Sequence, residues 1–150
     1  MSIHIQSHEL RFEPVVPTDE QVVLLYELLK SREHAISHYS IPSFVEHSHL
    51  VKNNPYRVWF LLNFKDRYIG SFYITSENTL GINILDLYLE DCLESIVLKA
   101  MSEFEPLPLL PSVRAIYFSI NVPFSNKVMA VKLESIGFIP TQITYKKQAL

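Results

Sequence analysis

The sequence predicts an α/β protein, with helices flanking a mixed, mostly antiparallel sheet in a single domain over residues 1–150. The chain has 150 residues, close to the commonest size of one domain. Hydrophobic residues make up 48% of it, enough for a substantial core. Segments with helical apolar spacing alternate with strand-like runs in the order β-α-α-β-β-β-α-β-α-β, without internal repeats.

The first two predicted elements are a strand and a helix. Residues 10–16 are strand-like and lead into Pro17, which stops the strand. Thr18 and Gln21 have capping-box spacing, which predicts that a helix starts there. Apolar residues then recur three or four positions apart and give this helix one face toward the core: Val22, Leu25, Tyr26 and Leu29.

A second, shorter helix is predicted after a polar loop over residues 31–41. Ser43 and Glu46 form another capping box at its start, and the helix must end before Pro55. Four residues share one of its faces: Phe44, His47, Ser48 and Val51.

The middle of the chain changes to strand periodicity. Residues 58–64 and 68–75 are apolar and aromatic, and a charged turn at 65–67 separates them, which predicts a hairpin. A third strand is expected near residues 80–85.

The last third is predicted to contain two helices and two strands. One helix is marked by Leu93, Ile96, Val97, Ala100 and Phe104. A stiff proline-rich connector over 105–111 leads to a strand over 113–122. Ser125 is expected to open the last helix and Gly137 to end it. Residues 139–147 are predicted to form the final strand.

Composition excludes several classes of partner and location. The formal net charge is −3 with a pI near 6.0, which argues against nucleic-acid binding and against a membrane-surface protein. Cys92 is the lone cysteine, so no intramolecular disulfide is expected and a reducing compartment is favoured. We see no signal-peptide pattern and no apolar run near the roughly 20 residues of a membrane span. A cytoplasmic protein is therefore expected.

The glycine and histidine patterns exclude further sites. The chain has only 3 glycines, Gly70, Gly81 and Gly137, too far apart for a dinucleotide or Walker phosphate loop. Its 6 histidines form no H-E-x-x-H motif, and a single cysteine excludes zinc-finger spacing. No metal site is predicted.

Three segments resemble the GNAT superfamily of acetyl-CoA-dependent N-acetyltransferases. Residues 126–138 resemble the family's N-x-x-S-x-x-x-Y-x-K-x-G-F segment and match it at Asn126, Gly137 and Phe138. Residues 68–74 resemble the family's third strand with its internal I-G. Residues 43–59 resemble the acceptor-side helix of members that acetylate small molecules, including amino sugars on nucleotide carriers.

The resemblance implies a fold, a reaction and a cofactor site. It implies transfer of an acetyl group from acetyl-CoA to the amine of a small molecule, with amino sugars among the expected acceptors. The pantetheine arm would hydrogen bond to the strand at residues 82–85 like an added strand. The expected cofactor-binding residues are Ile82, Ile84, Leu85 and Asn126. Asn126 is otherwise an ordinary first-turn residue.

The resemblance also places acid–base candidates. His47 would take the proton of the amine, because an imidazole titrates near neutral pH. Asp86 would orient the amine or a water at the end of the strand. The structural alternatives are a histidine that hydrogen bonds in a helix contact and an acid that only terminates a strand.

Substrate contacts are expected from two groups of residues. His34, His38 and Tyr39 lie on the polar loop that lines the acceptor site in the family, or form a solvated loop. Trp59 and Tyr73, with Tyr117, would form an aromatic wall, or pack as ordinary sheet residues.

Departures from the family pattern support an alternative function. The family's glycine-rich pyrophosphate loop falls on residues 89–94, which contain three carboxylates and no glycine. Asp91 and Glu94 have capping-box spacing instead. Leu133 and Met129 replace the family's tyrosine and serine. The alternative is a GNAT-shaped binding or assembly module that no longer binds CoA, and a homodimer is left open.

Overall fold

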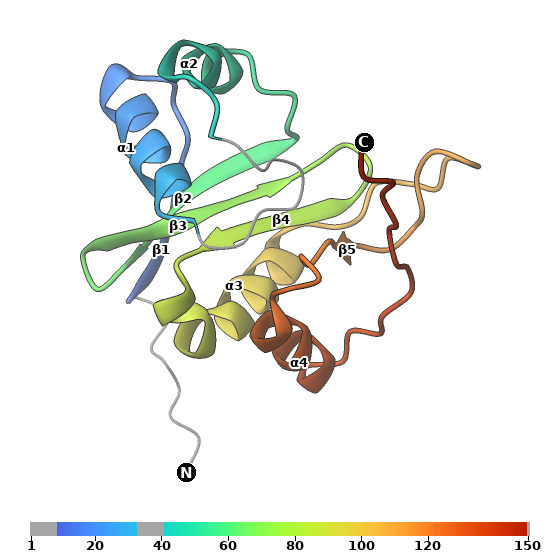
Figure 1. Ribbon diagram of the computed structural model, residues 1–150. Coiled ribbons are helices and arrows are strands. Elements are labelled where there is room, and N and C mark those ends of the chain that lie inside the picture. The colour runs from blue at the N-terminus through green and yellow to red at the C-terminus, as the bar shows by residue number, and fades with distance from the viewer. Residues whose placement is uncertain (1–8, 33–40, 150) are drawn as a thin grey trace.

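The computed structural model describes residues 9–32 and 41–149 and contains one five-stranded sheet (Figure 1). The strand order is β1-β2-β3-β4-β5, antiparallel except for the parallel pair β4–β5. The strands are β1 (Leu10–Pro14), β2 (Val58–Phe64), β3 (Arg67–Ile74), β4 (Thr79–Ile84) and β5 (Ser119–Ile120). The helices are α1 (Asp19–Lys30), α2 (Phe44–Lys52), η1 (Asp86–Tyr88), α3 (Leu89–Glu103) and α4 (Lys127–Ser135). The predicted fold class is confirmed.

Helices cover both faces of the sheet, α1 and α2 on one and α3 and α4 on the other (Figure 1). Under α1 and α2 the buried apolar residues are Val22, Leu25, Val51 and Leu61. The larger core lies between α3 and the sheet and includes Leu62, Phe72, Ile74, Leu80 and Ile96. Leu61 and Leu62, neighbours in β2, thus face opposite cores, as the pleat of a strand requires.

The helix start predicted at Thr18 is confirmed, but its capping box is only half formed. The Thr18 side chain accepts a hydrogen bond from the Gln21 amide at 3.3 Å and caps α1. Gln21 Oε1 accepts from the Val16 amide at 2.6 Å rather than from the Thr18 amide. Ser43 and Glu46 form both halves of a capping box at the start of α2. These bonds satisfy amides that a helix leaves unpaired at its N-terminus.

The predicted hairpin of β2 and β3 is also confirmed. Lys65 and Asp66 form its two-residue turn with φ of 51° and 63°. Two positive φ values are typical of the type I′ turn, whose twist matches that of the flanking strands.

The strand predicted over 113–122 is wrong except for Ser119–Ile120. The preceding segment turns back on itself, with a positive φ at Ser112 and a single bridge between Leu110 and Arg114. Side chains take its backbone groups: Asn78 Nδ2 donates to the Leu107 and Ala115 carbonyls at 2.9 and 2.8 Å. Backbone groups bound in this way are not available to a sheet.

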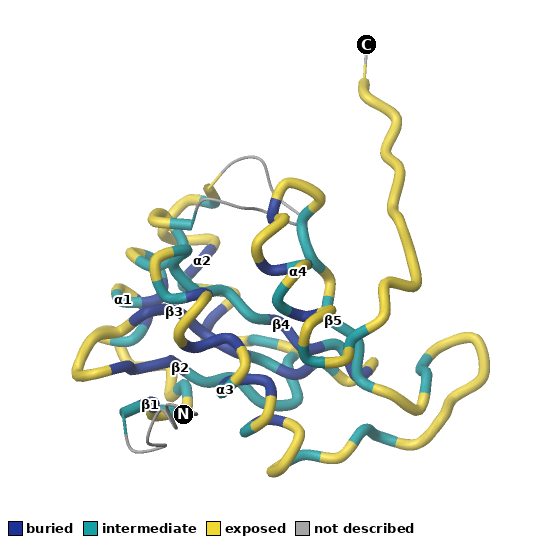
Figure 2. Tube along the Cα trace, turned by 90° about the horizontal axis from the view of Figure 1, so that it is seen from below, coloured by how far each residue is buried: buried dark blue, intermediate teal, exposed yellow. Residues whose placement is uncertain are grey.

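The strand predicted over 139–147 is wrong as well. This segment is extended and exposed, and Figure 2 shows it running away from the body of the molecule. Pro140 lacks an N–H, and β5 is too short to offer an edge with which a strand could pair. The alternating apolar residues Ile139, Ile143 and Tyr145 therefore face solvent.

Two helix starts differ from the predicted ones. α3 begins at Leu89 with Tyr88 as N-cap and no side-chain cap, so the expected capping box of Asp91 and Glu94 is wrong. Asn126, not Ser125, caps α4.

The end of α4 is as predicted. Gly137 has a φ of 104° and the Phe138 amide donates to the Leu133 carbonyl at 3.0 Å, as in a Schellman motif.

Candidate functional site

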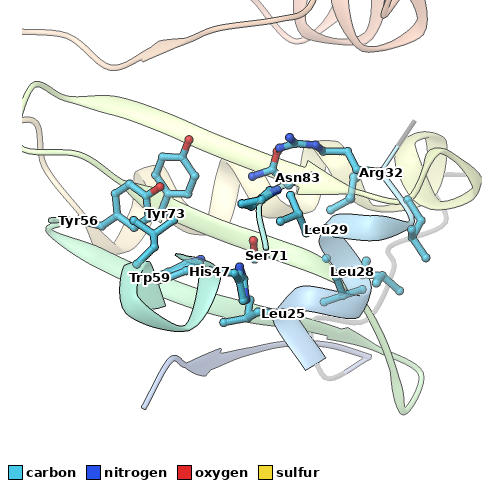
Figure 3. Close-up of a pocket in the computed structure, with 16 residues that line it drawn as sticks. Leu25, Leu28, Leu29, Arg32, His47, Tyr56, Trp59, Ser71, Tyr73 and Asn83 are labelled. Carbon is cyan, nitrogen blue, oxygen red and sulfur yellow. The ribbon is translucent and has the colours of Figure 1, made fainter. Parts of the chain in front are cut away.

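A pocket of about 160 Å³ lies between the sheet and the two helices α1 and α2. Leucines of α1 and strand residues of β3 and β4 line it, and Figure 3 shows an aromatic group at one end and Arg32 with Asn83 at the other. The polar side chains in the lining are Arg32, His47, Tyr56, Ser71, Tyr73 and Asn83.

The aromatic end is built in layers on β4. A Cβ at Gly81 would overlap the ring of Tyr73, its cross-strand partner, so that ring lies directly over the glycine. Tyr56 stacks on Tyr73 with ring centroids 4.0 Å apart and planes within 9°. Trp59 meets Tyr56 edge-on at 5.1 Å. The glycine in the strand thus sets the depth of the aromatic wall.

Two polar groups of this wall are held in a low-dielectric environment. Burial, with the neighbouring Tyr73, raises the pKa of Tyr56 to about 12, so the phenol stays neutral at working pH. The Trp59 indole N–H is buried and has no acceptor among the residues that the structure describes. A buried indole N–H usually has one.

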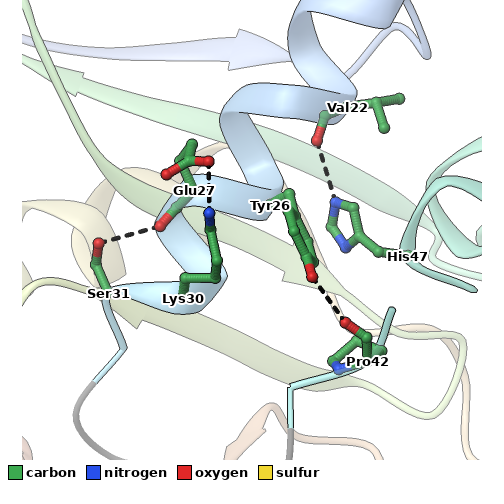
Figure 4. Close-up of polar contacts among 7 residues, drawn as sticks. All are labelled: Val22, Tyr26, Glu27, Lys30, Ser31, Pro42 and His47. Carbon is green, nitrogen blue, oxygen red and sulfur yellow. Dashed lines mark hydrogen bonds and ion pairs between the residues drawn. The ribbon is translucent and has the colours of Figure 1, made fainter. Parts of the chain in front are cut away.

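His47 joins α2 to α1 beneath the pocket (Figure 4). Its side chain is 4% exposed, and Nε2 donates to the Val22 carbonyl at 3.2 Å. Burial lowers the pKa of His47 more than this carbonyl raises it. The imidazole is therefore neutral at pH 7, and with its proton on Nε2, Nδ1 keeps a lone pair.

Three polar residues at the other end of the pocket were not predicted from the sequence. Ser71 and Asn83 face each other across β3 and β4. The Arg32 guanidinium donates from Nη1 to Asn83 Oδ1 at 3.3 Å. Asn83 could have indicated this polar end of the pocket, because an amide in an otherwise apolar strand needs a polar environment when it is partly buried.

The edge of β4 is open beside this end of the pocket. β4 pairs with β5 only at Thr79 and Leu80, and beyond that point the two strands separate. The Leu85 amide donates to the Ile69 carbonyl, and the Thr79 carbonyl accepts from the Thr75 amide. These two bonds show which residues of β4 direct their peptide groups toward β3. By the alternation of an antiparallel ladder, the peptide groups of Ile82 and Ile84 then point into the gap.

The turn that follows β4 presents amides and acids together. η1 leads directly into α3, whose N-terminus has no side-chain cap. Glu90 and Asp91 lie exposed in the first turn. The predicted loop at 89–94 is thus helical.

Cys92, in the same turn, is buried beneath it, and burial with Asp91 raises its pKa to about 11. A thiol with that pKa is not a nucleophile at neutral pH.

The structure brings together five of the predicted site residues: His47, Trp59, Tyr73, Ile84 and Leu85. Ile82 packs in the core under α3 and α4. Asp86 begins η1 and is not in the pocket lining. Asn126 lies away from the pocket, where its Oδ1 accepts from the Met129 amide at 3.2 Å. Tyr117 is exposed elsewhere.

Three of the predicted substrate contacts, His34, His38 and Tyr39, lie outside the described residues. The part of the chain that the structure describes holds no group of three metal-ligating side chains and no helix long and apolar enough to cross a membrane.

Comparison with known proteins finds similarity in fold only. No family model matches the chain, and no curated protein matches its sequence. An acetyltransferase from Thermus thermophilus is 19% identical, with a TM-score of 0.59 over 87% of this chain and 86% of its own.

Two aminoglycoside-modifying enzymes are also similar in structure. An aminoglycoside acetyltransferase from an uncultured soil metagenomic sample, in complex with sisomicin, is 13% identical, with a TM-score of 0.56 over 95% of this chain and 97% of its own. An aminoglycoside 6'-N-acetyltransferase from Acinetobacter baumannii is 11% identical, with a TM-score of 0.53 over 94% and 99% of the two chains.

Proposed function

Because the chain has the fold of the GNAT acetyltransferases, we propose that it transfers an acetyl group from acetyl-CoA to the amine of a small molecule. The observation that carries the proposal is the gap beside β4. The peptide groups of Ile82 and Ile84 point into it, and Ile84 also lines the pocket. A strand edge open at the mouth of a pocket suits an extended ligand that delivers its reactive end into that pocket.

The residues present fit acetyl-CoA at the strand and less well at the helix. The Ile82 and Ile84 peptide groups would hold the pantetheine arm, and the N-terminus of α3, which has no side-chain cap, would face the pyrophosphate, although the Leu89 amide already donates to the Asp86 carbonyl. When bound, the cofactor supplies an activated acetyl group. Glu90 and Asp91 oppose the phosphates, because like charges a few ångströms apart cost about 1 kcal/mol or more.

His47 is the base in this proposal. Its lowered pKa keeps it neutral, so Nδ1 can accept a proton from the attacking amine directly or through one water. The aromatic wall and the leucines of α1 give much of the site an apolar lining. Asp86 has no place in this scheme, since it lies outside the pocket lining.

The size of the pocket favours a small acceptor. Its volume of about 160 Å³ is below the roughly 300–1,000 Å³ of sites for drug-sized ligands. Aminoglycoside acetyltransferases are among the structural neighbours, but a whole aminoglycoside exceeds this volume. A small amine, or one ring of an amino sugar, is the better match.

The first experiment is calorimetric titration of the protein with acetyl-CoA and with free CoA. Micromolar binding, followed by acetylation of small amines, would support the proposal. His47→Ala should then lose most turnover. His47→Gln should lose it too, although glutamine keeps a donor for the Val22 carbonyl. Unchanged turnover in both variants would remove His47 from the reaction.

The acidic first turn of α3 favours a second candidate, a binding or assembly module that does not use CoA and that includes self-association as a homodimer. Its test is the same titration: no heat at millimolar acetyl-CoA would select it. A paired variant, Glu90→Gln with Asp91→Asn, identifies the cause. Tighter binding of CoA by this variant than by the wild type would show that the carboxylates weaken a functional site.

A further inference from the structure

We propose that the acceptor carries a carboxylate close to its amine, as an α-amino acid does, and that Arg32 binds this carboxylate. The inference rests on the proposed function, whose acceptor it specifies. Its basis is the polar end of the pocket, where Arg32, Asn83 and Ser71 stand together opposite the aromatic wall (Figure 3).

The described lining of the pocket carries one charged side chain, and its charge is positive. Among the described residues of the lining, Arg32 is the only side chain charged at neutral pH, because His47 and Tyr56 are held neutral. A guanidinium does not lose its proton in proteins. The described lining thus presents a fixed positive charge and no carboxylate, so it attracts an anion and repels a ligand with several ammonium groups.

The Arg32 guanidinium has N–H donors beyond the one that Asn83 uses. Arg32 is half-buried, and its hydrogen bond to Asn83 Oδ1 uses one of the five N–H donors of the guanidinium. This bond holds one edge of the guanidinium against Asn83. A planar fork of N–H groups binds a carboxylate through two parallel hydrogen bonds, which a lysine ammonium cannot do. The same bond orients the Asn83 amide at the pocket wall.

The hydrogen bond to Asn83 places the Arg32 guanidinium beside β4. Its partner Asn83 lies between Ile82 and Ile84, whose peptide groups face the gap on the other edge of the strand. A carboxylate on Arg32 therefore lies on the pocket side of the strand segment proposed to hold the acetyl donor.

The rest of the lining accounts for the remainder of such a molecule. Leucines of α1, and the aromatic wall at the end opposite Arg32, offer an apolar surface to the remainder of the ligand. An amino acid with an aliphatic or aromatic side chain matches this sequence of environments, whereas an amino sugar without a carboxylate offers no anion to Arg32, which has none among the described residues of the lining.

The test compares acids with their carboxamides, which keep the amine and the side chain and lose the charge. The probes are L-leucine and L-phenylalanine against leucinamide and phenylalaninamide, and glucosamine serves as an acceptor without a carboxylate. Calorimetric titrations are run with and without CoA, and kcat and KM are measured with acetyl-CoA. We expect the acids to bind and react about 10- to 100-fold better than the amides, as charge-assisted hydrogen bonds suggest.

Variants of Arg32 locate the discrimination. Arg32→Gln should raise KM for the acids about 10- to 100-fold, leave KM for the amides nearly unchanged and change kcat little. Arg32→Lys should restore only part of the preference. The matched control is Arg67→Gln, an exposed arginine of β3 outside the lining, which should behave as wild type. Urea unfolding of each variant checks that it is folded.

The two proposals fail in distinguishable ways. Equal binding and turnover of acids and amides by the wild type, or an acid preference that survives Arg32→Gln, would overturn the carboxylate inference and leave acetyl transfer standing. Absence of CoA binding would overturn the proposed function. Binding of the acids alone by such a protein, lost in Arg32→Gln, would retain Arg32 as the carboxylate site of a binding module.

Discussion

Single buried polar residues decide how this chain is assembled around its pocket. His47 is the clearest case, because one hydrogen bond to the Val22 carbonyl ties α2 to α1 while the ring also lines the pocket. Asn78 does the same for the chain between α3 and β5. Both side chains are almost fully buried and both have partners, as the low dielectric of an interior requires.

The lowered pKa of His47 predicts a pH dependence of stability. The unfolded chain binds the proton near the ordinary value of 6.5, and the folded chain binds it only at lower pH. The stabilising contribution of neutral His47 to the free energy of unfolding is therefore fully present above pH 6.5 and is lost as the pH drops toward the folded pKa. Urea unfolding at pH 7.5 and 5.5 measures this loss.

His47→Gln provides the comparison for that measurement. The variant should lose less stability than the wild type between the two pH values, because the other histidines titrate equally in both proteins. An equal loss in the two proteins would contradict the prediction.

Asn78 predicts a stability effect without a pH dependence. Its side chain makes three hydrogen bonds to the backbone of Leu107 and Ala115, and its φ of 67° suits asparagine better than alanine. Asn78→Ala should cost about 2 kcal/mol or more of unfolding free energy, since it leaves buried backbone groups unpaired. Asn121→Ala, on an exposed residue, should change it by less than about 0.5 kcal/mol. Similar costs for the two variants would count against this role.

At the scale of the elements, the site depends on how β3 and β4 pair. Gly81 leaves the space that the Tyr73 ring fills, and Tyr56 stacks on that ring. The Tyr73 ring thus fits because Gly81 on the neighbouring strand has no side chain. The shape of the aromatic wall therefore depends on the register that pairs these two residues.

Gly81→Ala should therefore displace Tyr73 and break the stack. We expect a loss of about 1–3 kcal/mol of unfolding free energy, as overpacking usually costs, together with a change in the near-ultraviolet circular dichroism of the tyrosines. In the background of Tyr73→Ala the same change should cost much less, because the ring is absent. Additive costs in this double-mutant cycle would show that the two residues do not interact.

At the scale of the molecule, the C-terminal segment contributes little to the folded domain. Residues 139–149 are exposed, and the apolar ones among them face solvent. A chain that ends after Phe138 should keep its unfolding free energy within about 0.5 kcal/mol, as urea unfolding would measure. A larger loss, or a change from dimer to monomer in light scattering, would mean that the segment packs against the body or against a second copy.

The fold could be predicted from the sequence wherever local signals decide the structure. The N-cap residues Thr18 and Ser43 placed the starts of α1 and α2, and strand periodicity with a charged turn placed the hairpin. The strands predicted over 113–122 and 139–147 were wrong because an apolar run indicates strand propensity but not a partner edge. In the first case, side chains distant in sequence, Asn78 above all, bind the backbone that a sheet would need.

The site was predicted only in part for a similar reason. His47, Trp59 and Tyr73 carry a recognisable residue type at a recognisable position. Arg32 follows the end of α1, which packs on β3, and meets Asn83 of β4 across 51 residues of sequence; neither residue belongs to a motif.

The separation of β4 from β5 also has a mechanical consequence. Strands β1 to β4 are joined by long antiparallel ladders and form a stiff plate, whereas β5 is attached to that plate by two residue pairs and by the packing of α4 on α3. The width of the gap can change without breaking any antiparallel ladder. A molecule that hydrogen bonds along the open edge of β4 and also contacts β5 would hold the two strands at a fixed separation. The rigidity of the C-terminal third therefore depends on what the gap holds.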